Sequence, residues 1–176
     1  HRQRGRPSTR LVHYEPFFYP LDSVKAWNRI YGRRGFLQFQ CVVPLAEAGG
    51  GAMQEILARI ARSGMASFLA VLKTFGDLES PGLLSFPRPG VTLALDFAYQ
   101  GSRTLSLFSD LERMTREAGG AVYPAKDACM TPESFAAAYP ALPRFRDFID
   151  PAFSSSFWRR VAGSSASLPS SVPSVA

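Results

Sequence analysis

Histidine is nearly absent from the sequence, and its scarcity excludes several kinds of enzyme. The two histidines, His1 and His13, both lie close to the start of the chain, which leaves none elsewhere for a histidine-based triad or a zinc site. The two cysteines, Cys41 and Cys129, match neither a metal-binding spacing nor a disulfide framework. No G-x-S-x-G, H-E-x-x-H, P-loop or C-x-x-C motif occurs. We predict no metal site, and if the protein is an enzyme, its chemistry must come from a cofactor.

Long apolar runs are missing as well. No uninterrupted run approaches the ~18 residues that a membrane span needs, and the basic start is not followed by the apolar stretch of a secretory signal. We therefore expect a cytoplasmic protein without a membrane span. A length of 176 residues suits one domain with a substantial core. The first residue is His1 rather than methionine, which indicates a fragment or a processed chain.

Charged residues make up only 19% of the chain, and the formal net charge is +6. The first ten residues hold four arginines (Arg2, Arg4, Arg6 and Arg10), so the remainder carries +2 (6 − 4). Positive charge confined to one terminus is typical of a flexible arm and not of a recognition surface. We therefore expect no nucleic-acid partner.

Hydrophobic periodicity predicts the order strand, helix, strand, strand, helix, strand. The strands are expected at 36–43, 68–75, 91–99 and 121–123, and the amphipathic helices at 53–61 and about 103–118. This order is the split βαβ pattern of a ferredoxin-like fold, in which an antiparallel sheet carries both helices on one face. The sequence therefore predicts an α+β fold with a C-terminal helical segment.

Composition divides the chain into four segments. Residues 1–15 form an irregular basic lead-in, and residues 16–121 contain the predicted sheet and helices. Within the latter segment we also expect a short helix that Asp22 caps and Gly32 ends, and a glycine-rich loop at 49–51. Residues 122–163 hold short helical patterns, including one capped by Thr131, but too little apolar pattern for an independent domain. We expect this segment to dock on something else. Residues 164–176 are rich in Ser, Pro and Ala, which predicts disorder.

One face of the predicted sheet stays uncovered if the helices pack on the face that carries Leu37, Phe39, Leu93 and Leu95. The uncovered face then combines polar and apolar side chains: Gln38, Gln40, Leu69, Val71, Lys73, Phe75, Thr92, Ala94 and Asp96. This mixture favours a ligand or a second domain over a buried core. A weakly amphipathic sheet in contact with water gives the same pattern, and both interpretations remain open.

An RNA-binding function is disfavoured, although many RNA-recognition modules share this element order. The string at 34–39 resembles part of their aromatic motif, yet that motif belongs on the third strand, where its aromatics stack on bases. Here it lies on the first strand, and the third strand offers Asp96, whose charge has the wrong sign for phosphates.

Several short strings are weak singly but specific in combination. They are FYPLD at 18–22, WNR at 27–29, YG at 31–32, GFLQFQ at 35–40, LKTFG at 72–76, LSFP at 84–87, LDF at 95–97 and YPAKD at 123–127. Together they resemble the C-terminal half of FAD-linked oxidases of the vanillyl-alcohol-oxidase type. Within that group they are most similar to the decaprenylphosphoryl-ribose 2-oxidases, over about residues 16–161.

This resemblance implies an FAD cofactor and a division of labour between domains. An N-terminal domain would bind FAD, residues 16–121 would form the substrate domain, and residues 122–163 would return to the FAD domain. The FAD-binding segment would then precede residue 1, and the present chain alone would neither bind flavin nor turn over. The implied function is oxidation of a sugar-type or lactone alcohol by hydride transfer to the flavin. The alternative is a non-enzymatic ferredoxin-like module whose open sheet face binds a protein partner.

The resemblance also assigns residues to a site. Lys126 corresponds to the active-site lysine near flavin and substrate, where its charge would stabilise an anionic flavin or a substrate oxygen. Tyr123 would help to hold the cofactor. The substrate-binding residues would be Tyr19, Gln38, Gln40, Lys73, Phe75 and Thr92. One departure leaves the substrate open: Thr92 and Ala94 stand where the close relatives carry Asn and Cys.

Overall fold

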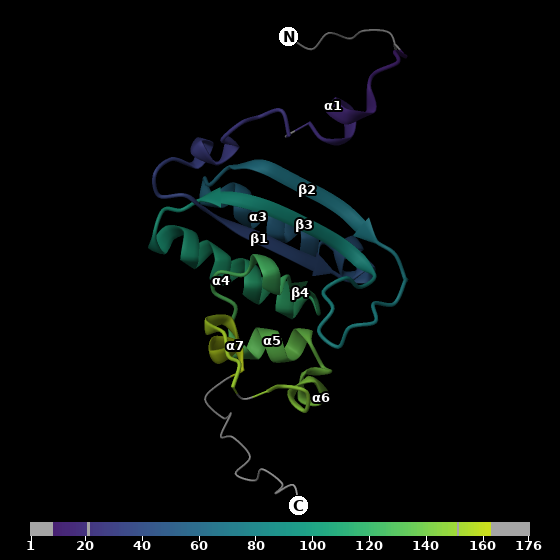
Figure 1. Ribbon diagram of the computed structural model, residues 1–176, viewed down its shortest axis with the longest axis vertical. Helices are drawn as coiled ribbons and strands as arrows, with labels where there is room; N and C mark the ends of the chain where they lie inside the picture. The colour runs from purple at the N-terminus through teal and green to yellow at the C-terminus, as the bar shows by residue number, and fades with distance from the viewer. Residues whose placement is uncertain (1–8, 21, 151, 163–176) are drawn as a thin grey trace, which may run out of the picture.

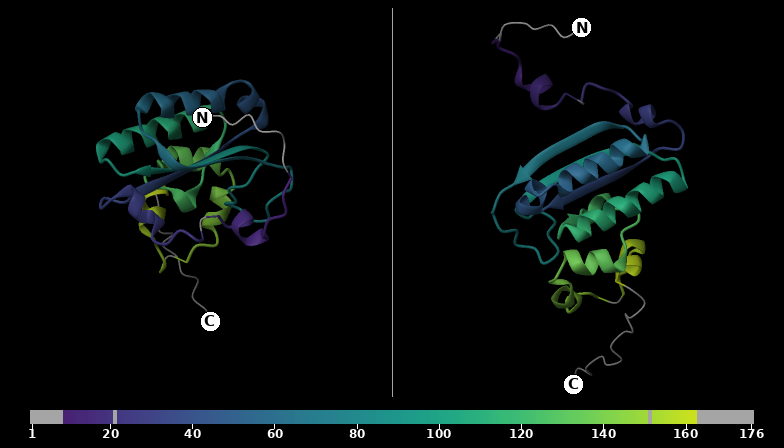
Figure 2. Two further views of the ribbon diagram at one scale, coloured as in Figure 1. Left: turned by 90° about the horizontal axis from the view of Figure 1, so that it is seen from above. Right: turned by 180° about the vertical axis from the view of Figure 1, so that it is seen from behind.

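The computed structural model describes residues 9–20, 22–150 and 152–162. It contains a four-stranded sheet, with two longer helices on one of its faces (Figures 1 and 2). The strands are β1 (Phe36–Val43), β2 (Ser67–Phe75), β3 (Gly90–Ala98) and β4 (Ala121–Val122). Their order in space is β2-β3-β1-β4, and every neighbouring pair is antiparallel. The α+β fold predicted from the sequence is therefore confirmed, with the strand order of a split βαβ unit.

The helices α3 (Ala52–Ser63) and α4 (Ser102–Glu117) lie side by side behind the sheet in Figure 1 and in front of it in the right view of Figure 2. Their buried apolar residues are Met53, Ile56 and Ile60 from α3 and Leu107, Phe108 and Leu111 from α4. The Phe108 ring packs edge-on against Phe39 of β1 and Phe97 of β3, with centroids 5.5 and 5.6 Å away. The core between this helix layer and the sheet follows the predicted apolar stripes.

The strand register decides which side chains share a face. β1 and β3 pair Gln38 with Asp96 and Gln40 with Ala94, and β2 and β3 pair Lys73 with Thr92. Residues directly opposite one another project to the same side of a sheet. These side chains therefore lie on the face opposite α3 and α4, which we call the open face. A register shift between Ser67 and Ala70 interrupts the simple alternation expected at the start of β2.

Two glycines allow neighbouring chain to approach β1 closely. A Cβ atom on Gly90 would overlap with the carbonyl of Val43, and one on Gly120 would overlap with the carbonyl of Val42. Only glycine leaves room for this packing. The two positions fix where β3 begins and where the chain enters β4.

The C-terminal segment packs beside β4. It contains the short turn η2 (Pro124–Lys126) and the helices α5 (Pro132–Ala138), α6 (Leu142–Arg146) and α7 (Ser156–Val161), which extend the molecule beyond the β4 edge (Figure 1). Thr131 caps α5 through the N–H of Ser134, as predicted. The buried Tyr139 hydroxyl donates to the carbonyl of Val122 at 3.1 Å. Apolar side chains of this segment thus join the core of the sheet domain, while its return to an FAD domain stays a prediction.

The N-terminal part differs from the sequence prediction. A helix α1 spans Tyr14–Phe18, where the lead-in was expected to be irregular through residue 15. The prediction of a helix that starts at Asp22 was wrong. Ala26 has a left-handed backbone (φ 54°), which interrupts a right-handed helix, and only the 3-10 turn η1 (Trp27–Tyr31) follows it. A short helix α2 (Leu45–Gly49) occupies part of the expected glycine-rich loop. The predicted tail at 164–176 and the first eight residues of the lead-in lie outside the described residues.

Within the described ranges, no helix combines the length and hydropathy that crossing a bilayer requires.

Candidate active site on the open sheet face

The two glutamines of β1 form hydrogen bonds to side chains of β3. Gln38 donates through Nε2 to Oδ1 of Asp96 at 2.9 Å, and Gln40 donates through Nε2 to Oγ1 of Thr92 at 3.2 Å. Each glutamine therefore has a partner within the sheet, so their presence does not by itself require a ligand. These bonds orient both amides. Gln38 is half-buried, so its Oε1 atom remains an acceptor that a hydroxyl-bearing ligand could use, whereas Gln40 is only 7% exposed.

Asp96 connects three separate parts of the chain. Its buried carboxylate accepts a hydrogen bond from the Tyr31 hydroxyl at 3.3 Å in addition to the bond from Gln38, and its N–H donates to Oγ of Ser67 at 3.0 Å. Burial, and secondarily the negative charge of Asp96, raises the pKa of Tyr31. Tyr31 therefore stays a neutral donor, and the carboxylate ties η1 to the sheet.

Thr92 lies deeper than the sequence prediction placed it. Only 1% of the residue is exposed, so its hydroxyl does not reach a ligand on the open face in this structure. The hydroxyl instead accepts the hydrogen bond from Gln40.

Three aromatic rings, the Phe86 group (Phe75, Phe86 and Tyr123), close one end of the open face. The Phe86 ring stacks on Tyr123 with centroids 4.6 Å apart and meets Phe75 edge-on at 6.0 Å. Because Phe75 lies on the outer strand β2 and Tyr123 follows the opposite outer strand β4, Phe86 spans the sheet between them. Thr92 lies on the intervening strand β3, and both Thr92 and Phe86 are buried. Lys73 extends over the Phe75 ring, with Nζ 5.9 Å from its centroid.

A second aromatic cluster, the Tyr31 group (Trp27, Tyr31, Phe36 and Phe68), lies at the other end. The Tyr31 ring stacks on Phe36 at 4.4 Å and meets Phe68 edge-on at 5.5 Å. Between the two aromatic ends lies a polar middle made by Gln38, Gln40 and Asp96, in which Gln38 is half-buried and the other two are buried. Such a surface suits a ligand that combines hydroxyl groups with apolar faces.

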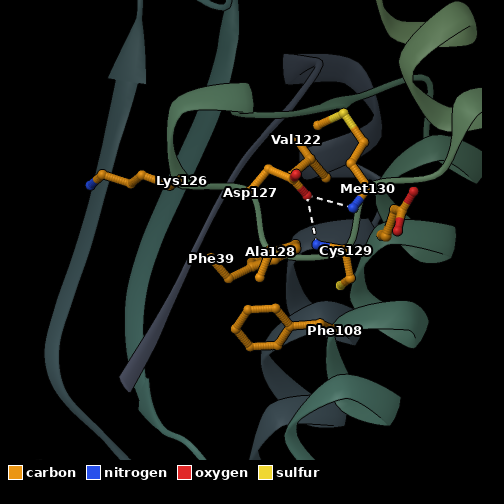
Figure 3. Close-up of a pocket in the computed structure, with 9 residues that line it drawn as sticks. Phe39, Phe108, Val122, Lys126, Asp127, Ala128, Cys129 and Met130 are labelled. Carbon is orange, nitrogen blue, oxygen red and sulfur yellow. Dashed lines mark hydrogen bonds between the residues drawn. The ribbon is translucent and has the colours of Figure 1, made fainter. Parts of the chain in front are cut away.

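Lys126 ends the turn η2, three residues after Tyr123. Its side chain is half-buried and extends away from Phe108 and Cys129 (Figure 3). Across the described part of the chain, no carboxylate forms an ion pair with Lys126. Its positive charge is therefore available to an external group.

The small cavity beside this turn is not a substrate site. It lies on the α4 side of the sheet, between Phe39, Phe108 and Cys129. Its volume is ≈ 10 Å³, about the space that one water molecule requires. Neither a sugar nor a flavin ring fits there.

The two cysteines are unsuited to nucleophilic catalysis. Burial raises the pKa of the Cys41 thiol to about 11. Burial, with the negative charges of Asp127 and Glu112, raises the pKa of Cys129 to about 11 as well. Both thiols are protonated at neutral pH. No cluster of three metal-binding side chains occurs among the described residues.

The structure brings most of the predicted site residues together, but Thr92 is buried in the sheet and Tyr19 lies apart from it. Gln38, Gln40, Lys73, Phe75 and Tyr123 share the open face. Tyr19 follows α1, is 55% exposed and belongs to a segment that Figure 1 shows beyond the β2 edge. We therefore leave Tyr19 out of the candidate site.

Sequence reasoning missed Tyr31 and Phe86 as parts of this face. Tyr31 precedes β1 by a turn, and Phe86 lies in a Pro- and Gly-rich loop. Neither has a periodic signal that would assign it to a sheet face. The available indication was that both belong to strings that carry the resemblance, YG at 31–32 and LSFP at 84–87.

The fold is an α+β domain whose antiparallel sheet carries α3 and α4 on one side and the open face on the other. No profile of a known protein family matches the chain. Over 166 residues the chain is 37% identical to a decaprenylphosphoryl-β-D-ribose oxidase of Mycolicibacterium smegmatis, a match that covers 92% of the chain and 35% of that protein. It is 33% identical over 165 residues to an uncharacterized protein in the mprA 5′ region of Streptomyces coelicolor, covering 91% of the chain and 44% of that protein.

These matches confirm the resemblance predicted from the sequence, which concerns the C-terminal part of the named oxidase. The chain spans about a third of the length of the first relative and less than half of the second. The activity, substrate and partners of a complete protein are therefore matters of proposal.

Proposed function

We propose that this chain is the substrate-facing part of an FAD-dependent oxidoreductase that oxidises a sugar-type or lactone alcohol. The observation that carries the proposal is the composition of the open face. Side chains from β1, β2 and the end of β4 meet there, opposite the layer of α3 and α4. The likeness to a sugar oxidase over nearly the whole chain supports this assignment.

The residues present fit one part of FAD. Lys126 offers a half-buried positive charge, and Tyr123 offers an aromatic ring three residues away. A cation beside an electron-accepting ring stabilises negative charge on that ring. The sequence holds no glycine-rich strand–helix turn of the kind that binds dinucleotide phosphates. We assign only the ring end of FAD to this chain and the phosphates to a segment outside it.

Each group on the open face has a role in this proposal. When bound, FAD supplies the acceptor for a hydride from the alcohol carbon. The oriented amide of Gln38 accepts a hydrogen bond from a substrate hydroxyl, the buried Gln40 supports the floor of the site through its bond to Thr92, and Lys73 attracts an anionic substituent. Phe75 and Tyr123 bound the site with apolar surface and exclude water. Lys126 stabilises the oxygen or ring on which negative charge develops.

The proposal is tested on the complete protein that contains this chain. It is expected to purify yellow with bound flavin and to lose the colour of oxidised flavin when mixed without oxygen with an aldonolactone or a polyol. Buffer without the added alcohol, and a sugar derivative whose hydroxyl groups are all blocked, serve as controls. A complete protein that is colourless and does not bind added FAD would contradict the proposal.

The alternative function is a non-enzymatic module that binds a protein. A complete protein with this function would be colourless and would not bind added FAD. One observation favours it: β2 is an outer strand with exposed apolar side chains, Phe68 and Leu72 among them. In the proposed enzyme, the exposed side chains of β2 would instead pack against another part of the complete protein. Flavin content therefore separates the two functions.

A further inference from the structure

The carboxylate of Asp127 lies buried in the turn that follows Lys126. Its side chain is 2% exposed and forms an ion pair with Arg160. Its Oδ1 accepts hydrogen bonds from the N–H groups of Cys129, at 2.9 Å, and Met130. A buried carboxylate needs such donors, because an unpaired charge in this position would be strongly disfavoured.

Arg160 reaches this turn from α7, 33 residues further along the chain. Its guanidinium also lies over the Phe157 ring, 5.7 Å from the centroid. The neighbouring Arg159 points elsewhere and donates to the Ser154 hydroxyl at 3.2 Å. Arg160 is therefore the residue through which α7 holds the turn.

Lys126 and Asp127 are adjacent in sequence but extend in opposite directions (Figure 3). The same region holds a second buried carboxylate, Glu112 of α4, which accepts hydrogen bonds from the N–H of Thr131 at 2.7 Å and from its hydroxyl at 3.0 Å. The raised pKa of Cys129 reflects burial together with both carboxylates. Arg160 forms an ion pair with one of these carboxylates, Asp127.

We infer that Arg160 is a positioning residue: it holds the Asp127 carboxylate on the α4 side of the turn and thereby keeps the Lys126 ammonium free of a counter-charge. This inference rests on the proposed function, in which Lys126 stabilises developing negative charge. Without Arg160, Asp127 becomes the nearest available partner of Lys126 along the chain. An ammonium paired with a carboxylate is a weaker electrostatic catalyst, because its field is largely cancelled.

The test uses the complete protein and compares Arg160→Gln with Arg159→Gln, a matched control on the same helix. Turnover of the Arg160→Gln protein is expected to fall ~10-fold or more, as for a displaced catalytic group. A second measurement does not depend on activity: trace acetylation with acetic anhydride, read by mass spectrometry as the rate at Lys126 relative to Lys25. Lys126 is expected to react more slowly in the Arg160→Gln protein, since pairing with Asp127 keeps its amine protonated.

The double variant Asp127→Asn/Arg160→Gln removes both charges and is expected to recover most of the labelling rate and of the turnover. Wild-type turnover and labelling in the Arg160→Gln protein would overturn the inference. Equal losses of turnover in the single and double variants, with unchanged labelling, would assign a structural role alone and would also overturn it.

If Arg160→Gln does not fold, Arg160→Lys keeps the charge and is expected to label as wild type; slower labelling would count against the inference. If Lys126 proves dispensable for turnover, the catalytic role proposed for Lys126 fails. The acetylation rates at Lys126 in the wild-type and Arg160→Gln proteins would still report whether Asp127 pairs with it.

Discussion

Among single residues, Lys126 combines partial burial with a positive charge that no described carboxylate neutralises. Replacing it with methionine keeps the length of the side chain and removes the charge. In the complete protein, Lys126→Met is expected to lower turnover by ~100-fold or more, the usual effect of deleting one electrostatic stabiliser. Anaerobic flavin reduction in a single turnover measures this directly. Lys25→Met, in the N-terminal segment, is the control, and a Lys126→Met protein with the wild-type rate would remove Lys126 from the catalytic role.

Thr92 provides a second test at the scale of one residue. Thr92→Val removes the acceptor of the buried Gln40 amide and is expected to lower the free energy of unfolding by about 1–3 kcal/mol. Thr92→Ser keeps the hydroxyl and should lose less. Denaturant titration of the 176-residue chain measures both values.

The control for this comparison is Thr74→Val on the outer strand β2, where the threonine is exposed. Its effect is expected to stay within roughly 0.5 kcal/mol. Equal stabilities of the Thr92→Val and Thr74→Val chains would show that the Gln40–Thr92 bond does not hold the open face together.

For the elements, the contact of β3 with β1 depends on Gly90. Gly90→Ala places a methyl group against the backbone of Val43 and is expected to cost about 2 kcal/mol or more, since the strands must separate to accept it. Gly76→Ala is the matched control, because nothing lies within 4 Å of a Cβ there. Thermal unfolding of the two variants distinguishes them, and a Gly90→Ala chain as stable as Gly76→Ala would be inconsistent with the close approach.

The regular elements were predictable because each carries its own periodic signal. The bounds of β1 match the alternation at 36–43, and α4 begins and ends within one residue of its predicted stripe. The shared face of Gln38, Gln40 and Lys73 follows from alternation once the strand order is known. The sheet and most of the open face could therefore be predicted locally.

The remaining features depend on contacts between residues distant in the sequence. Arg160 and Asp127 are 33 residues apart, and nothing near either residue indicates the other. The position of Phe86 over the sheet depends on the path of an irregular loop. At Asp22 a local signal was present but misleading. Asp22 is a good capping residue, yet it starts no helix, because the backbone at Ala26 is left-handed.

At the scale of the whole molecule, the two cysteine thiols make the free energy of unfolding depend on pH in the alkaline range. The pKa of Cys41 and of Cys129 is raised from 9.0 in an unfolded chain to about 11 in the fold. From pH 9 upwards, the unfolded chain releases these protons before the folded chain does. The stability that neutral thiols confer is therefore complete below pH 9 and is lost as the pH rises towards 11.

Denaturant unfolding at a series of alkaline pH values tests this expectation. The chain should lose stability steadily in that interval, and a Cys129→Ser chain, which has one titrating thiol fewer, should lose it less steeply. A slope unchanged by Cys129→Ser would show that other groups cause the alkaline loss.

The central place of β1 in the sheet has a consequence for how the protein is made. β1 is synthesised before its two neighbours in the sheet, β3 and β4, which begin at Gly90 and Ala121. During that interval of translation, the apolar strand Phe36–Val43 has no partner among the described strands with which to hydrogen-bond. The nascent chain therefore carries an unpaired β-segment until β3 has been synthesised, which makes it a natural client for a chaperone that shields such segments.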